Sequence, residues 1–329
     1  MDTPSISVVV VAYRQREALA ACLDACVAAG AAVPGEIELI VVDNGGLASF
    51  VRAQCPSAAL LEPGDNIGFA GGVQLGIEAA RGRWIALVND DARLEPSALA
   101  TLLAAGERDA QTGAVAAQVR FEAHPETINS AGIEVDVLGV ANERFAGQPL
   151  ELAGGDGGFV FGASACVALY RAEMLRQIGG FDRRFFAYLE DVDVAWRARA
   201  AGWQAWYEPR AVAYHSASAS TGAASPQKYF LAGRNRVSLL ARNATRRQLL
   251  RALPGIVLYD SAYVVYVAAA DRTLAPLWGR LLGLRQWRRL RHEMASRRRE
   301  VALAPALAGA RAAWKMQRAY RRAAGSRGG

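Results

Sequence analysis

The feature that constrains the fold most is a series of short apolar runs that are followed by loops or polar turns, most abruptly at Asn89-Asp90-Asp91. These runs are Ile6–Val11, Ile37–Val42 and Trp84–Val88, and each has the length of a buried strand. The segments between them carry apolar residues at helical spacing and end at glycine or proline. Because strands and helices alternate with short connections, the pattern predicts an α/β fold with a doubly wound, mostly parallel sheet.

The second half of the predicted sheet is less regular. We expect a strand over residues 114–119, and short antiparallel strands within the glycine- and asparagine-rich residues 121–158. A single buried strand is predicted from Phe159 to Tyr170. A further strand is predicted from Ala211 to His215, which is one of only three histidines in the chain.

The composition is that of an ordered globular protein, with 52% hydrophobic and 21% charged residues among 329. The cysteines show no metal or redox spacing, and the N-terminus shows no signal pattern, so we expect reduced thiols in the cytoplasm. The most apolar stretch, Ala252–Ala270, contains Pro254, Gly255 and Asp260, which argues against a membrane-spanning helix.

Polar residues follow the strands at the edge where open α/β sheets bind ligands. Asn89, Asp90 and Asp91 end the third apolar run, and two adjacent carboxylates suit a divalent cation that also holds phosphates. The same residues also suit a solvated turn. Asp43, after the second strand, can hydrogen-bond a nucleobase or ribose, although Asp-Asn-Gly is also an ordinary turn.

A glycine-rich turn over residues 64–72 leads into a helix and could bring backbone N–H groups close to a nucleotide. It lacks the GxGxxG and Walker A spacings. A second centre of chemistry is the start of the helix at Glu190, Asp191 and Asp193, behind an aromatic run. Acids there complement the helix dipole as caps, but a shielded carboxylate also suits a general base. His215 is either a ligand or a structural histidine.

In this order, the segments resemble the inverting, nucleotide-sugar-dependent glycosyltransferases of family 2, which have the GT-A fold. The resemblance is greatest to the bacterial rhamnosyltransferase-like branch that builds cell-wall and surface polysaccharides. It covers roughly Ser5 to Asn243. The matching segments are SVVVVAYRQREALAACLDA, LIVVDNGG, NIGFAGGVQLGI, WIALVNDD, GASACVALYR, IGGFDRRFFAYLEDVDVAWRARAAGW, YHSASAS and YFLAGRNRVSLLARN.

The resemblance implies roles for individual residues. The donor nucleotide would be bound by Ala12, Tyr13, Asp43, Asn66, Gly71 and Asp90. Asp91 would be the main ligand of Mg²⁺ or Mn²⁺, with His215 as a further ligand, while Asn89 replaces the first acid of the family's DXD motif. Asp191, in the Glu190-Asp191 pair, falls where the family has its catalytic base. Residues 1–243 would then form the catalytic domain, and residues 244–329 a basic, amphipathic helical extension.

The implied reaction moves a sugar from a nucleoside-diphosphate sugar, dTDP-rhamnose or a UDP-sugar, to a hydroxyl of a glycan or polyprenyl-linked acceptor. A single metal-assisted displacement would invert the anomeric carbon. Two other functions use similar sheets. A sugar-phosphate nucleotidylyltransferase should carry a glycine-rich basic loop after the first strand, where this chain has AYRQREALA. A non-catalytic nucleotide-sugar-binding protein has no need of Asp91, Asp191 and His215 together.

The chain has a net charge of +7, and in the extension arginines are concentrated around Trp278 and Trp287. Arginine and tryptophan on amphipathic helices favour the interface of an anionic membrane, which would make the protein peripheral on the inner face of the cell membrane. The alternative is a helical extension that packs on the catalytic domain or pairs two subunits in a homo-oligomer. We expect no nucleic-acid partner, since no nucleic-acid-binding motif accompanies the charge.

Overall fold

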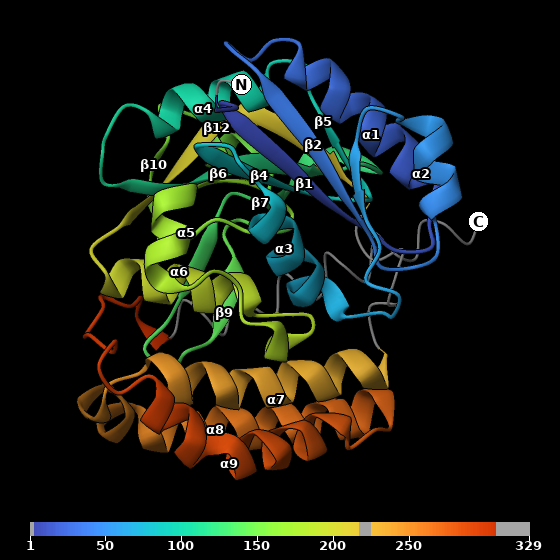
Figure 1. The fold of residues 1–329 in the computed structure, drawn as a ribbon. Coiled ribbons are helices and arrows are strands. Elements are labelled where there is room, and N and C mark those ends of the chain that lie inside the picture. The colour runs from blue at the N-terminus through green and yellow to red at the C-terminus, as the bar shows by residue number, and fades with distance from the viewer. Residues whose placement is uncertain (1–2, 217–224, 307–329) are drawn as a thin grey trace.

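The computed structural model describes residues 3–216 and 225–306, and within them the chain is built around a ten-stranded mixed sheet (Figure 1). The main strand order is β10-β12-β6-β11-β4-β1-β2-β3, with β5 paired to β12 and β7 paired to β6. The predicted α/β fold class is confirmed. The sheet is parallel in its N-terminal half and mixed in the other half.

The parallel half forms from the apolar runs that open the sequence. Its elements are β1 (Ile6–Ala12), α1 (Arg16–Gly30), β2 (Ile37–Asp43), α2 (Ala48–Gln54), β3 (Ala59–Leu61), α3 (Gly68–Ala79) and β4 (Trp84–Asn89). Val10 of β1 lies beside Val41 of β2 and Val88 of β4. This register brings the carboxyl ends of three neighbouring strands, and the polar residues after them, to one edge.

The other half of the sheet differs from the prediction at one strand. The apolar segment from Phe159 to Tyr170 is not one strand but two, β10 (Gly158–Val160) at the sheet edge and β11 (Val167–Arg171) in the middle. Between them the chain leaves the sheet and passes α6, where Gly162 has no room for a Cβ because of Ala195. The crossing carries Ser164 and Ala165 to the functional site.

Shorter elements complete the α/β part. They are β5 (Ala92–Leu94), α4 (Ala98–Gly106), β6 (Thr112–Phe121), β7 (His124–Ser130), β8 (Ile133–Val135), β9 (Ala141–Glu143), η1 (Leu150–Ala153), α5 (Ala172–Ile178), η2 (Arg183–Phe185), α6 (Glu190–Ala200) and β12 (Gln204–His215). Helices α1, α2 and α4 pack on one face of the sheet, and α3, α5 and α6 on the other. The short antiparallel strands expected within residues 121–158 are present.

Three long helices form a separate layer below α3, α5 and α6 (Figure 1). They are α7 (Pro226–Asn243), α8 (Arg246–Asp271) and α9 (Ala275–Glu293). Helix α7 packs closely on α9 because Gly233, Gly279 and Gly283 carry no side chain. A Cβ at any of these three positions would meet the backbone of the partner helix. The domain division at residue 243 stays a prediction. Helix α7 lies before that boundary and α9 after it, and the two helices pack closely on each other.

Helix α8 corrects one expectation. Pro254 and Gly255 do not interrupt it, and it runs without a break for 26 residues. Within the described part of the chain, α8 alone is long and apolar enough to cross a membrane, judged by length and composition only. The expectation that Pro254 and Gly255 would interrupt the helix is therefore wrong, whereas the expectation that α8 does not span a membrane stays a prediction.

Candidate functional site

A cavity of about 970 Å³ lies at the carboxyl ends of β1 and β4 and extends to the α7–α9 layer. It brings together residues predicted from widely separated motifs. Those that line it are Tyr13, Asn66, Asp90, Asp91, Glu190, Asp191 and His215. Ala12, Asp43 and Gly71 are not among the residues that line it in the described structure. The donor, metal and base groups expected from the sequence thus largely share one space.

Asp90 anchors the loop after β1. Its Oδ2 accepts a hydrogen bond from the backbone N–H of Tyr13 at 2.6 Å, and its side chain is buried. Burial and the neighbouring charge of Asp91 together raise the pKa of Asp90 to about 7, although the Tyr13 hydrogen bond acts in the opposite direction. The two acids of the motif therefore differ, since Asp90 fixes the backbone and Asp91 faces the cavity.

The glycine-rich turn is held by two asparagines at the cavity wall. Asn44 Nδ2 donates to Asn66 Oδ1 at 2.9 Å, and Asn66 Oδ1 also accepts from the N–H of Gly68. Asn44 Oδ1 accepts from the N–H of Ile67 at 2.9 Å. The pair fixes the entry to α3, where backbone groups face the cavity.

Asp43 stabilises the turn after β2. Its Oδ1 accepts hydrogen bonds from the N–H groups of Gly45 and Leu47, which is the ordinary turn weighed in the sequence. Ala12 is fully buried in β1, and Gly71 packs against Ile67 inside α3. The role of these three residues in nucleotide binding stays a prediction.

Asp91 and His215 meet because of a strand that the sequence did not reveal. Strand β5 follows Asp91 and pairs antiparallel with β12, in a register that sets Ala92 beside His215. The Nε2 of His215 lies 3.0 Å from Asp91 Oδ1, and its Nδ1 lies 3.1 Å from Asn129 Oδ1. An amide on one ring nitrogen orients the imidazole, so the other nitrogen and the carboxylate face each other at the cavity wall.

The Asp91–His215 pair suits a cation that takes some of its ligands from the protein and the others from a bound substrate. No cluster of three or more His, Cys, Asp or Glu side chains with metal-binding geometry occurs in residues 3–216 and 225–306. A metal here would take oxygen from Asp91, nitrogen from His215, and the remaining ligands from a diphosphate and water. Mg²⁺ and similar ions are commonly bound in this way, through one or two carboxylates and substrate phosphates.

A second group of acids lies across the cavity. Glu190 and Asp191 lie at the start of α6, Glu143 lies on β9, and the charge of Asp191 acts on both glutamates. Burial, together with the neighbouring charge of Asp191, raises the pKa of Glu143 to about 7 and that of Glu190 to about 8. Burial also raises the pKa of Asp191. Because like charges disfavour ionisation of buried neighbours, the raised pKa values favour protonated Glu143 and Glu190 beside Asp191 near neutral pH.

Asp191 is held in place by backbone donors. Its Oδ2 accepts from the N–H of Ala165 at 3.1 Å, and its Oδ1 accepts from the N–H of Val192 at 2.8 Å. The side chain of Glu190, by contrast, has a buried Oε2 with no hydrogen-bond partner among the described residues. Asp191 is therefore oriented toward the cavity as an acceptor, while Glu190 is suited to hold a proton.

The loop before α6 is strained and braced. Phe186, Tyr188 and Leu189 have φ angles of 63°, 73° and 66°, which side-chain-bearing residues rarely adopt. Asn235 of α7, which is 1% exposed, donates to the carbonyl oxygens of Phe185, Ala187 and Tyr188 at 2.7–2.9 Å. One buried amide thus satisfies three carbonyl groups of the strained loop.

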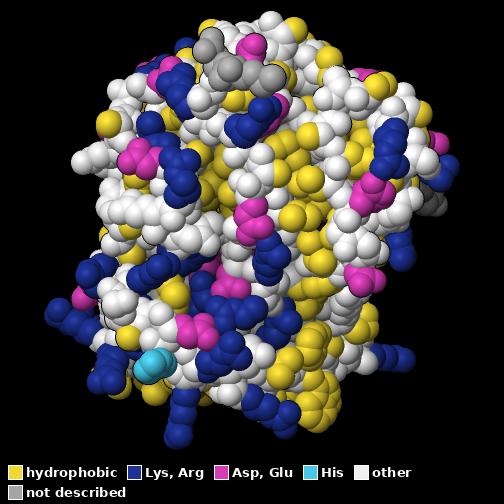
Figure 2. Space-filling view, in the orientation of Figure 1, with side chains coloured by type: hydrophobic (Ala, Val, Ile, Leu, Met, Phe, Trp, Pro, Cys, Tyr) yellow, Lys and Arg dark blue, Asp and Glu magenta, His cyan; other side chains and the backbone are white. Residues whose placement is uncertain are grey.

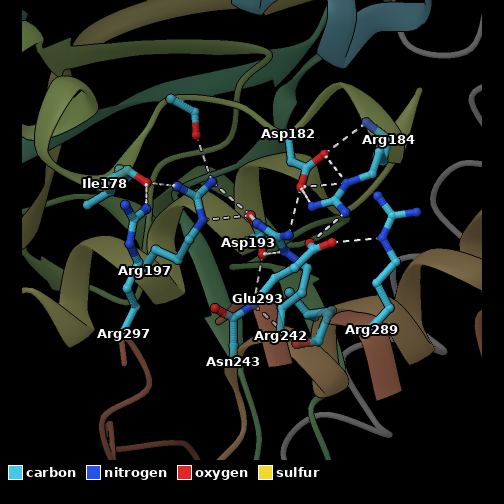
Figure 3. Close-up of polar contacts among 12 residues, drawn as sticks. Ile178, Asp182, Arg184, Asp193, Arg197, Arg242, Asn243, Arg289, Glu293 and Arg297 are labelled. Atoms are coloured by element: carbon cyan, nitrogen blue, oxygen red, sulfur yellow. Dashed lines mark hydrogen bonds and ion pairs between the residues drawn. The ribbon is translucent and has the colours of Figure 1, made fainter. Parts of the chain in front are cut away.

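A buried ion network continues this brace (Figure 3). Asp193 of α6 is fully buried and contacts Arg197 at 2.7 Å and Arg242 of α7 at 2.8 Å. Although burial alone would raise it, these arginines hold the pKa of Asp193 well below its usual range. Arg242 also binds Asp182 at 2.7 Å. Asp193 is the third acid of the motif, and it secures α6 to α7 and does not face the cavity.

The far end of the cavity is basic and aromatic. Lys228 and Arg236 come from α7, Arg280 from α9, and Tyr259 and Tyr263 from α8. Sequence reasoning missed these residues and Glu143. Glu143 lies in the irregular part of the chain, where spacing carries no signal, and the arginines were interpreted only as part of a basic surface. The serine-rich run after His215 lies outside the described residues from residue 217 onward.

Comparisons with known proteins agree with this geometry. The chain matches the family described as glycosyltransferase like family 2 over residues 4–233. It is 29% identical over 214 residues to the N-acetylglucosaminyl-diphospho-decaprenol L-rhamnosyltransferase of Mycobacterium tuberculosis, which covers 56% of this chain and 68% of that protein.

Two solved structures have a similar fold. The mannosyltransferase PcManGT of Pyrobaculum calidifontis, in complex with GDP-Man and Mn²⁺, aligns over 98% of this chain and 86% of its own, with a TM-score of 0.51 and 18% identity. GalNAc-T7 with UDP, GalNAc and Mn²⁺ aligns over 74% of this chain and 49% of its own, with a TM-score of 0.58 and 12% identity. The nucleotidylyltransferase alternative is thereby set aside, and the chain belongs to glycosyltransferase family 2 as a glycosyltransferase with the GT-A fold.

Proposed function

We propose that the protein transfers a sugar from a nucleoside-diphosphate sugar to a hydroxyl group of a polyprenyl-diphosphate-linked acceptor, with inversion at the anomeric carbon. The observation that carries the proposal is that the Asp91–His215 pair and the carboxylate of Asp191 line a single cavity. One end suits a diphosphate leaving group and the other a proton acceptor, and these are the two groups that a single displacement needs.

The donor would lie against the loop after β1 and the turn held by Asn44 and Asn66. Tyr13 and Arg14 line this end, with the Arg14 guanidinium 5.0 Å from the centre of the Tyr13 ring. Asp91 and His215 would hold Mg²⁺ or Mn²⁺, which neutralises the diphosphate charge that develops as the bond to the sugar breaks. The two solved relatives bind Mn²⁺ together with nucleotide ligands, which supports a divalent metal.

Asp191 would take the proton of the attacking hydroxyl. Its two backbone hydrogen bonds fix its direction, and its raised pKa makes it a better proton acceptor than an exposed aspartate. Glu190 and Glu143, with pKa values of about 8 and about 7, would keep protons and so relieve repulsion on Asp191. No covalent enzyme intermediate is needed.

The mycobacterial relative supports a finer assignment. Its name states transfer of L-rhamnose to N-acetylglucosaminyl-diphospho-decaprenol. We therefore propose dTDP-rhamnose, in preference to a UDP-sugar, as the donor. We propose a lipid-diphosphate-linked sugar, in preference to a free glycan, as the acceptor. The product would serve cell-wall or surface polysaccharide synthesis.

The test is Asp191→Asn, assayed for metal-dependent transfer from a panel of nucleotide sugars. The variant should fold and bind donor with Mn²⁺, but transfer should fall at least about a hundredfold because the general base is lost. Asp24→Asn, an exposed change on α1, is the matched control and should keep full activity. Near-native transfer by Asp191→Asn would refute the base assignment, and a wild-type protein that uses no nucleotide sugar would refute the proposed reaction.

A membrane-linked acceptor also requires a place for the enzyme at the membrane. Helix α8 exposes an apolar stripe, in which Leu250, Leu258 and Val265 are 74%, 73% and 68% exposed. Figure 2 shows hydrophobic side chains gathered at the lower right of the helical layer and Lys and Arg side chains along its lower edge. The helical layer also carries exposed arginines, on α8, after it and on α9, at Arg246, Arg247, Arg251, Arg272, Arg285, Arg288 and Arg289.

This arrangement suits a helix that lies on an anionic membrane. The opposite side of α8 carries Asp260, which binds Arg236 at 2.6 Å and Arg280 at 2.8 Å. Crossing the bilayer would separate this acid from its two arginines and leave a charge near the centre of the helix, which is costly. We therefore propose that α8 lies in the interface, with its apolar stripe toward lipid and its polar side toward the protein.

A further inference from the structure

Apart from Arg14 and His215 at the donor end, the acidic and basic residues that line the cavity are divided between its two ends. The acids Asp90, Asp91, Glu143, Glu190 and Asp191 come from the sheet edge, β9 and the start of α6. The helical layer contributes the cations Lys228, Arg236 and Arg280. A metal at the Asp91–His215 pair accounts for the first group. The cations lie apart from it, on different elements, and the donor site does not use them.

The two arginines among these cations are buried, and Lys228 is half-buried. Arg236 and Arg280 are each 7% exposed. Both bind the same oxygen of Asp260, and each lies about 5 Å from a tyrosine ring of α8, at 5.0 Å for Tyr259 and 5.2 Å for Tyr263. Burying two guanidinium groups on one carboxylate oxygen leaves positive charge in excess, which is costly unless an anion joins them.

One observation points directly to an anion. The Nε of Arg280 is buried and has no hydrogen-bond partner among the described residues, although its other nitrogens bond to Asp260 and Pro276. Asp136 lies near Arg236, but it accepts backbone hydrogen bonds from Leu138 and Val140 and burial raises its pKa, so it offsets the positive charge only in part. Lys228 adds a third cation at the same end, 5.5 Å from the centre of the Tyr188 ring in the loop before α6. Buried donors without acceptors are rare in folded proteins and call for a ligand.

We propose that Lys228, Arg236 and Arg280 form a metal-independent subsite for the diphosphate of the acceptor. This inference rests on the proposed function, because it assigns the acceptor's charged group to a place in the same cavity. Bidentate guanidinium groups and an ammonium are the usual partners of phosphate oxygens. A diphosphate held here would leave the acceptor sugar in the space between the subsite and Asp191, with its hydroxyl toward the base.

The position of α8 explains how a lipid would enter. Tyr259 and Tyr263 face the cavity, while Val257 and Leu258, on the same helix, are 57% and 73% exposed. The wall of the subsite and the apolar stripe are therefore two sides of one helix. A diphosphate bound inside would have its hydrocarbon chain leave past α8 toward the membrane that the stripe contacts.

The first test measures binding without catalysis. Farnesyl diphosphate is titrated into the full-length protein in EDTA by calorimetry, so that metal-dependent binding at the donor end is absent. Wild type and Asp91→Asn should bind alike, whereas Lys228→Gln and Arg280→Gln should weaken binding at least about tenfold. Arg285→Gln removes an exposed arginine of α9 outside the cavity and should have no effect. Because Arg280→Gln disturbs the Asp260 pair, the half-buried Lys228 provides the decisive variant if that protein does not fold.

The second test uses transfer. With one sugar presented either on a lipid diphosphate or on an uncharged alkyl glycoside, Lys228→Gln should raise KM for the first acceptor only and leave KM for the donor unchanged. Equal binding of farnesyl diphosphate by wild type and Lys228→Gln, or an equal KM change for both acceptors, would overturn the subsite. A protein that binds farnesyl diphosphate through these residues but transfers no sugar would overturn the proposed function and leave the subsite standing.

Discussion

At the scale of single residues, the same type of side chain takes different roles according to its partners. Asp193 is paired with arginines and stays ionised, with a lowered pKa. Glu190, three positions earlier, has no cation beside it and a pKa raised to about 8 by burial. Asp191 lies between them and has backbone donors on both oxygens. Neighbouring positions on one helix thus carry a structural ion, a buried acid with a raised pKa and the proposed base.

Glu190 should make stability depend on pH. Its pKa rises from 4.5 to about 8 on folding, so the folded state holds the proton more tightly than the unfolded chain. The wild-type free energy of unfolding should therefore fall as pH rises from about 4.5 through about 8. Glu190→Gln cannot ionise and should lose less stability over that range.

Urea unfolding of both proteins at pH about 5 and about 8.5 measures the difference. The exposed Glu17→Gln serves as the control and should follow the wild type at both values. If Glu190→Gln loses as much stability as the wild type between the two pH values, Glu190 is ionised in the folded protein and its protonation beside Asp191 is wrong.

At the scale of elements, α7 is the brace of the catalytic loop. The loop over residues 184–189 has little regular structure apart from η2. Several of its carbonyl oxygens accept hydrogen bonds from side chains of α7. Arg234 donates to the carbonyl oxygens of Arg184 and Phe185, and Asn235 donates to those of Phe185, Ala187 and Tyr188. Because strained backbone persists only where its surroundings fix it, α7 sets the position of Asp191 through this loop.

Asn235→Ala should therefore act on catalysis as well as stability. Removing the amide leaves buried carbonyl groups without a donor, and the expected loss is about 1–3 kcal/mol in the free energy of unfolding. The turnover number should fall more than the KM for the donor rises, because Asp191 moves while the donor end keeps its contacts. Ser238→Ala, one turn further along α7, removes only a local bond to Arg234 and is the control.

Stopped-assay kinetics with saturating donor separate the two effects. A fall in stability with an unchanged turnover number of the folded enzyme would show that Asn235 is structural only. A fall in turnover shared by Ser238→Ala would show that any disturbance of α7 has the same consequence, and the specific role of Asn235 would be lost.

At the scale of the whole molecule, the cavity is closed on one side by a helical layer that also faces outward. The layer joins the α/β part through the Asn235 contacts and the ion network of Asp193 and Arg242 (Figure 3). Helix α8 packs on the layer through Ile256 and Val267, and Asp260 and Asp271 bind side chains of α7 and α9. Its opposite side exposes apolar residues, which suits a part that faces a membrane.

Liposome flotation tests this role. The full-length protein should float with vesicles that contain anionic lipid, and the triple change Leu250→Ser, Leu258→Ser and Val265→Ser should reduce the floating fraction severalfold, because exposed apolar area drives insertion. Val27→Ser, an exposed valine of α1 on the other side of the molecule, is the control. Flotation that survives the triple change would remove the proposed membrane surface, and a dimer that the triple change dissociates would assign the stripe to a second copy of the chain.

Much of the site could be predicted from the sequence because its parts are local. A buried apolar run that stops at Asn89-Asp90-Asp91 reveals a strand end, and the parallel arrangement of neighbouring strands gathers Tyr13, Asn66 and Asp91 at one edge. Glu190 and Asp191 were found in the same way, at the start of a helix behind an aromatic run. Local patterns of hydrophobicity and polarity carry this information.

The remaining features depend on contacts between distant segments. The division of Phe159–Tyr170 into two strands, the meeting of His215 with Asp91 through β5, and the approach of Glu143 to Asp191 all depend on register and crossing, which no local spacing encodes. The sequence by itself determined the sheet, its ligand-binding edge and the acids on it. Only the tertiary structure decided which arginines of the extension face inward, because burial and ion pairing with Asp260 depend on how α7, α8 and α9 pack, and an arginine in a run of arginines gives no sign of its direction.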